Sequence, residues 1–136
     1  MFNRPFDEQS HLRIRLETEA KLAIQEEIRR GTFQLIWSYV LDYENSKNPF
    51  QERTEQIIKW KKYAITDIEE NTEILNAAIL LNTNGLKKMD SLHIACAGFA
   101  NADYFLTTDD KVIKKAGSIT HVIIIDPIDF IKQVLP

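Results

Sequence analysis

The sequence predicts an α/β fold with a mostly parallel sheet of about four strands. Short apolar runs typical of buried strands alternate along the chain with segments whose apolar residues recur at helical spacing. One carboxylate stands at the start of a predicted helix and another stands just past the end of a predicted strand. The second position matters because ligands of parallel α/β sheets bind at the carboxyl ends of the strands. The alternation of strands and helices places the chain in the α/β class.

The first quarter of the chain predicts a long helix followed by a strand. Residues 3–7 are expected to form a turn, because Pro5 disfavours helix at the residue before it, and Asp7 or Ser10 is expected to cap the helix. Gly31 ends the helix. Its single apolar stripe consists of Leu12, Leu16, Ala20, Ala23, Ile24 and Ile28. Residues 33–37 are nearly all apolar, which is typical of a strand covered on both faces.

Three helices and one strand are predicted over the next fifty residues. Ser38 is expected to cap a short helix that contains Glu44. A helix over residues 50–63, a strand over residues 64–68 and a helix over residues 70–81 follow, and a turn rich in Asn and Gly closes this part of the chain.

The stretch from Lys88 to Lys115 contains the residues on which a functional prediction depends. Asp90 begins a helix of small apolar residues, residues 104–106 form a short strand, and Asp109 opens another helix. A further strand over residues 122–125 leads to a last helix with Pro at its first position, where proline is well tolerated.

Composition indicates a single domain without a strong overall charge. A length of 136 residues suits one domain, and a net charge of −3 argues against nucleic-acid binding over the whole surface, while a local basic patch remains possible. Cys96 lies between two alanines, so we expect a buried thiol and not a catalytic one. The sequence has neither a signal-peptide core nor an apolar run long enough to span a membrane. We therefore expect a cytoplasmic protein with no membrane partner.

Carboxylates are the candidate functional groups. The sequence contains no serine elbow, CxxC pair or glycine-rich phosphate loop, and no two of its histidines have metal-binding spacing. Glu44, Asp90 and Asp109 are acids that the predicted fold could bring together, and clustered carboxylates repel unless a cation offsets their charge. Oxygen ligands suit Mg²⁺ or Mn²⁺. Simple helix capping is the alternative for acids at helix starts.

The segment MDSLHIACAGFANADYFLTTDDKVIKKA resembles the C-terminal half of a PIN domain. In that family an Asp begins a helix of small apolar residues, and a strand then ends in Thr-x-Asp or a close variant. The segment WSYVLDYE, residues 37–44, resembles the family's Ser followed six residues later by a helical Glu, although Asp42 lies close by. Residues 2–9 and 13–17 are similar to the start of one subgroup, so the resemblance covers nearly the whole chain.

The resemblance implies a three-layer α/β/α domain that acts as a metal-dependent endoribonuclease. It suggests the VapC-like toxins of toxin–antitoxin pairs, with RNA, a cognate antitoxin and a second copy of the chain as partners. The catalytic acids would be Glu44, Asp90 and Asp109. Together with Asp110 they would hold Mg²⁺ or Mn²⁺, which activates a water and stabilises charge on phosphorus. Thr107 and Thr108 would orient a carboxylate or a water.

The chain departs from the family pattern at its N-terminus. A PIN domain begins with a central strand that ends in Asp, and this sequence begins after that strand, so we expect a single, N-terminally truncated PIN-like domain over residues 1–136. Asp7 is not expected to replace the missing acid. Loss of one acid should weaken the metal site, and the strands at residues 33–37 and 104–107 should flank the vacant centre with edges open to pairing. Either the natural protein begins earlier or the short form is a degenerate member.

Two functions follow as hypotheses. The first is a Mg²⁺- or Mn²⁺-dependent endoribonuclease with poor activity in this short form. The second is a catalytically inactive PIN-like module that self-associates or binds an antitoxin or RNA. Lys87, Lys88 and Lys111 lie near the acids and could contact phosphates; lysines that only improve solubility are an equally weighted alternative.

Overall fold

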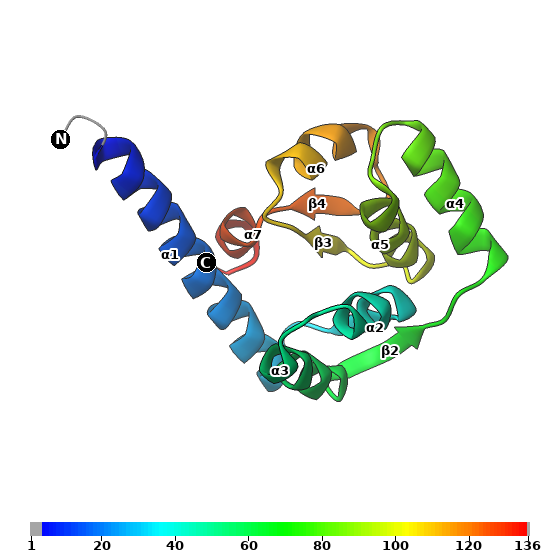
Figure 1. Cartoon of the computed structure of the whole chain (residues 1–136), viewed down its shortest axis with the longest axis horizontal. Coiled ribbons are helices and arrows are strands. Elements are labelled where there is room, and N and C mark those ends of the chain that lie inside the picture. The colour runs from blue at the N-terminus through cyan, green and yellow to red at the C-terminus, as the bar shows by residue number, and fades with distance from the viewer. Residues whose placement is uncertain (1–3, 136) are drawn as a thin grey trace.

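The computed structural model describes the backbone of residues 4–135 and the side chains of residues 11–135, and its order of elements is mixed α/β (Figure 1). The elements are α1 (Arg4–Arg30), β1 (Leu35–Ser38), α2 (Tyr39–Ser46), α3 (Gln51–Lys61), β2 (Ala64–Ile68), α4 (Thr72–Thr83), α5 (Lys88–Phe99), β3 (Tyr104–Leu106), α6 (Asp110–Lys115), the 3₁₀ turn η1 (Ala116–Ser118), β4 (Ile123–Ile125) and α7 (Pro127–Val134). The predicted order of strands and helices is confirmed, with boundaries that differ by a few residues.

The four strands form two separate parallel pairs. β1 pairs with β2, and β3 pairs with β4 in a register that joins Leu106 to Ile125. Parallel pairing is therefore confirmed, whereas a single four-stranded sheet is not what the described residues form. The physical reason is that no strand of the described chain supplies a hydrogen-bonded ladder between the two pairs. Helix α5 instead contacts β1 and β3, one strand of each pair.

Helices cover both faces of the β3–β4 pair. Phe105 and Ile124 pack into a cluster that includes buried residues of α5 and α6. Leu106 and Ile125 pack on the opposite side, in a cluster to which α1 and α7 contribute. Alternate residues of a strand point to opposite faces, so the apolar residues Phe105, Leu106, Ile124 and Ile125 are explained by packing on both sides, while Ile123 at the start of β4 is exposed.

Helix α1 differs most from its prediction. It begins at Arg4, so residues predicted as a turn are helical, and Asp7 and Ser10 lie inside the helix instead of capping it. Proline is compatible with the first turn of a helix because no intrahelical partner is lost there. Helix α7 lies beside the second half of α1 (Figure 1), and the predicted apolar stripe is buried only there. Leu12 and Leu16 in the first half are exposed. No helix in the described residues is long and apolar enough to cross a membrane.

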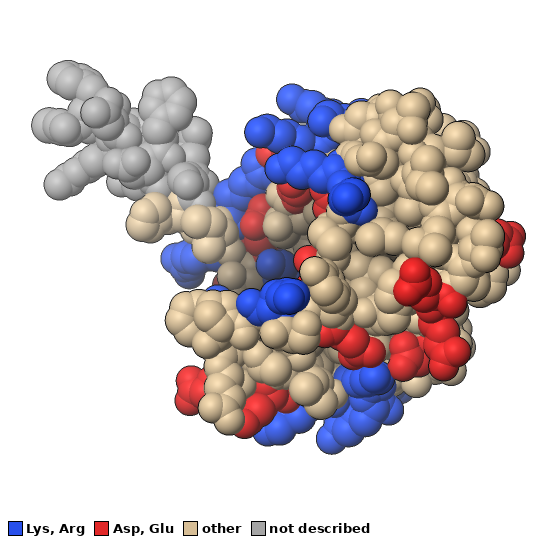
Figure 2. Space-filling view, turned by 45° about the vertical axis from the view of Figure 1, so that its right-hand side comes forward, with Lys and Arg blue, Asp and Glu red and all other residues tan. Residues whose placement is uncertain are grey.

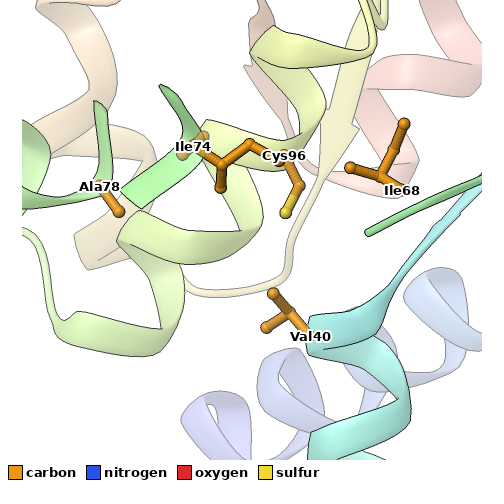
Figure 3. Packing of buried hydrophobic residues seen from close by; sticks show 6 residues of the cluster. Val40, Ile68, Ile74, Ala78 and Cys96 are labelled. Atoms are coloured by element: carbon orange, nitrogen blue, oxygen red, sulfur yellow. The ribbon is translucent and has the colours of Figure 1, made fainter. Parts of the chain in front are cut away.

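The largest helix–helix contact joins α4 and α5. Ile74 and Ala78 of α4 meet Cys96 of α5, and Val40 of α2 and Ile68 of β2 complete this cluster (Figure 3). Cys96 is buried, as predicted. Burial raises the pKa of its thiol, and a hydrogen bond with Ser38 opposes part of that rise. The alanines on either side of Cys96 are also buried, and small side chains let neighbouring backbones approach closely.

We predict that Ile74→Ala destabilises the protein by about 2–5 kcal/mol, because a side chain that is 1% exposed leaves a cavity when it is shortened. Ile79→Ala on the same helix is the matched control. Its side chain is 63% exposed, so the change should stay within about 0.5 kcal/mol. Urea unfolding followed by circular dichroism measures both. Equal losses in the two variants would contradict the assignment of α4's buried face.

Candidate functional site

Glu44 lies on the side of α2 that meets α5. Its carboxylate contacts Nε2 of His93, and its side chain is 48% exposed while that of His93 is 14% exposed. His93 stands three residues after Asp90 on α5, and residues at this spacing lie on the same face of a helix. The structure therefore brings two of the three predicted acids, Glu44 and Asp90, to neighbouring helices.

Asp42 has a different environment from Glu44. Its carboxylate accepts a hydrogen bond from the indole Nε1 of Trp37 at 2.9 Å and one from Lys61 Nζ at 3.1 Å. Burial raises the pKa of Asp42, but the hydrogen bonds from Trp37 and Lys61 outweigh it and hold this pKa below the usual 3.8. Asp42 thus ties β1, α2 and α3 together, and Glu44 is the acid of this segment that faces α5.

The acids after β3 are held by local partners. Asp109 caps α6 by accepting a hydrogen bond from the backbone N–H of Lys111 at 2.9 Å, and Thr107 Oγ1 accepts one from the backbone N–H of Asp109 at 3.1 Å. Asp110 pairs with Arg13 of α1 at 2.7 Å, and this hydrogen bond lowers the pKa of Asp110. Thr107 therefore shapes the turn, and Asp110 has a cationic partner in place of a metal.

Asp90 and the three predicted phosphate-binding lysines each lie at the start of a helix, either α5 or α6. Asp90 is partly buried in the first turn of α5, where the helix dipole favours a carboxylate. Lys87 occupies the position before that helix without a capping side-chain hydrogen bond, Lys88 is the first helical residue, and Lys111 lies in the first turn of α6; all three are exposed. In Figure 2 positive and negative side chains alternate around a central hollow, so neither sign of charge covers this face alone.

The predicted acids do not form a metal site in this arrangement. Within residues 11–135 no three His, Cys, Asp or Glu side chains stand together in a way that could hold a metal ion. Carboxylate oxygens suit Mg²⁺ and Mn²⁺, but Glu44 contacts His93 and Asp109 caps its own helix. The donor chemistry fits a hard divalent cation, and in the described chain each of these two acids has a different partner.

An open groove of about 500 Å³ beside Glu44 was not predicted. Among the residues that line it are Tyr43 and Phe50, whose side chains are more than half exposed, and the cations Lys47 and Arg53. A sequence signal for it exists, because two aromatic residues and two cations flank the Asn-Pro turn at residues 48–49.

No protein-family model, curated protein or solved structure matches this chain.

Replacing Asp42 with Asn should lower the urea midpoint at about pH 7, because the hydrogen bond from Lys61 loses its charged acceptor. The folded pKa of Asp42 lies below its unfolded value, so its stabilisation is present above the unfolded pKa and is lost as pH falls through the folded pKa. Urea midpoints of the variant and the wild type should therefore approach each other as the pH falls below the usual Asp pKa of 3.8.

Asp103→Asn is the control for this experiment, since Asp103 is an exposed Asp outside the Trp37 and Lys61 contacts. A variant whose midpoint equals that of the wild type at neutral pH would contradict the structural role given to Asp42.

Proposed function

We propose that the chain is a PIN-like domain that acts on RNA as a Mg²⁺- or Mn²⁺-dependent endoribonuclease, and that residues 1–136 alone do so weakly. The observation that carries the proposal is the contact between Glu44 on α2 and His93 on α5, one turn from Asp90. Two carboxylates whose positions match the family's acidic motif are thereby held by two packed helices and are not scattered over the surface.

The arrangement of strands supports the same proposal. Both strand pairs are parallel, and α5, which carries Asp90, contacts β1 and β3. Asp109 follows β3 directly, so it stands past the carboxyl end of a parallel strand, the location at which α/β sheets bind ligands. Helix α2, which bears Glu44, contacts α5, and α5 contacts β3, the strand that precedes Asp109.

Weak activity is expected from the arrangement of the acids. A divalent cation needs several oxygen ligands in a defined geometry, and within residues 11–135 the candidate acids do not form such a set. A misplacement of about 1 Å can lower an enzymatic rate roughly 100-fold. The toxin–antitoxin context, the antitoxin partner and the homodimer stay predictions that rest on the resemblance alone.

A catalytically inactive RNA-binding module is the second candidate function. The specific observation in its favour is that two acids of the motif have other partners: the backbone N–H of Lys111 for Asp109 and Arg13 for Asp110. Such contacts give the acids a structural role that does not depend on the chain being an enzyme. Cleavage and binding must therefore be measured separately.

We predict slow cleavage of single-stranded RNA by the 136-residue chain, dependent on Mg²⁺ or Mn²⁺ and abolished by a chelator. Glu44→Gln and Asp90→Asn should each lower the rate by more than about tenfold, the loss typical of residues that support a metal site. Gel analysis of a labelled RNA over time measures the rate. Circular dichroism verifies that each variant is folded.

Asp103→Asn serves again as the matched control, since it removes an exposed acid outside the proposed set. Cleavage that persists in the chelator would overturn the metal-dependent mechanism. A folded chain that binds RNA without cleaving it in any divalent cation would favour the second candidate function.

A further inference from the structure

The groove beside Glu44 is built where α2 ends and α3 begins. Asn45 is buried, and its Nδ2 donates a hydrogen bond to the backbone oxygen of Thr54 at 3.1 Å, which fixes α2 against α3. Asn48 Oδ1 accepts a hydrogen bond from the backbone N–H of Phe50 at 3.0 Å, which fixes the turn between the helices. The walls of the groove are therefore held in place by hydrogen bonds that do not involve its exposed side chains.

Two aromatic rings are presented at this groove. Tyr43 is 54% exposed and Phe50 is 57% exposed. Single exposed apolar residues are common on protein surfaces, but here two rings line one shallow, open depression within the same short segment. Exposed aromatic rings at a fixed site provide flat apolar faces on which another ring system can stack.

A cation accompanies each ring. Lys47 Nζ lies 5.4 Å from the centre of the Tyr43 ring, and the guanidinium carbon of Arg53 lies 5.0 Å from the centre of the Phe50 ring. Both cations line the groove. Rings paired with cations along a groove are the combination with which proteins bind single-stranded nucleic acid, because the rings stack on bases while the cations neutralise phosphates.

We propose that this groove, which we call the Tyr43–Phe50 groove, binds unpaired bases of single-stranded RNA on the rings of Tyr43 and Phe50, with Lys47 and Arg53 at the neighbouring phosphates. The choice of RNA rests on the proposed function, because Glu44 lines the same groove. A base stacked here holds the adjoining backbone next to Glu44. A duplex is excluded as the preferred ligand, since its bases are already stacked on one another.

The test is fluorescence anisotropy of a labelled single-stranded octauridylate with the full chain in EDTA, so that binding is measured without cleavage. Tyr43→Leu and Phe50→Leu should each weaken binding by about 5- to 100-fold, the effect of removing one stacking platform. Tyr43→Phe should retain most of the affinity because the ring remains. Lys47→Gln should reduce the slope of log affinity against log salt by about 0.7, as expected for one lost phosphate contact.

Phe99→Leu is the matched control, because Phe99 is 42% exposed and lies on α5 outside the groove. Its affinity should equal that of the wild type. The same RNA annealed to its complement should bind more weakly, whereas single-stranded DNA of matching sequence should bind comparably, since both strands offer unpaired bases.

Three results would overturn the groove assignment: folded wild-type chain that does not bind the single strand, unchanged affinity in Tyr43→Leu and Phe50→Leu, or preference for the duplex. If the groove assignment is right and only the proposed nuclease activity is wrong, the results differ from these three. In that case the ring variants lose affinity in EDTA, and the wild-type chain cleaves no RNA with metal.

Discussion

The burial of helix α5 is the constraint on which the rest of the structure depends. Ile94 is fully buried, and Ala95, Cys96 and Ala97 are nearly so. One side of the helix packs against α4, and its flanks contact β1 and β3, so it joins two strand pairs that have no hydrogen-bonded ladder between them. Asp90 lies in the first turn of α5, and His93 of the same helix contacts Glu44 of α2. The same packing that stabilises the fold therefore positions the candidate acids.

Most helices and strands were predictable from residues that lie close together in the sequence. The remaining features of the fold depend on contacts between residues that are far apart in the sequence. Asn-Pro and Asp-Pro turns, helical periodicity and short apolar or β-branched runs located the helices and all four strands. A gap between the strands at residues 33–37 and 104–107 was expected from the resemblance, but which strand pairs with which was not predictable, because pairing depends on which strands become neighbours and not on their composition. The early start of α1 was missed since Pro5 disfavours helix before it, yet fits within a first turn.

The candidate acids were chosen from the sequence, and their contacts were not predictable from it. Spacing and resemblance selected Glu44, Asp90 and Asp109, but they could not reveal that Arg13, nearly a hundred residues earlier, pairs with Asp110. Nor could they distinguish Asp42 from Glu44, whose difference arises from Trp37 and Lys61. The Tyr43–Phe50 groove was overlooked because its residues belong to two helices that are joined by a turn.

The buried cysteine of α5 has an experimental consequence. Cys96 is the sole cysteine of the sequence and is 3% exposed within the α4–α5 cluster. Alkylating reagents attack the thiolate, and burial both blocks access and raises the pKa of this thiol. Under native conditions a reagent therefore reaches the thiol of Cys96 only when α4 and α5 separate locally. The rate of alkylation then reports the free energy of that local opening. The chain thus contains an internal chemical reporter of the stability of the helix pair that holds Asp90.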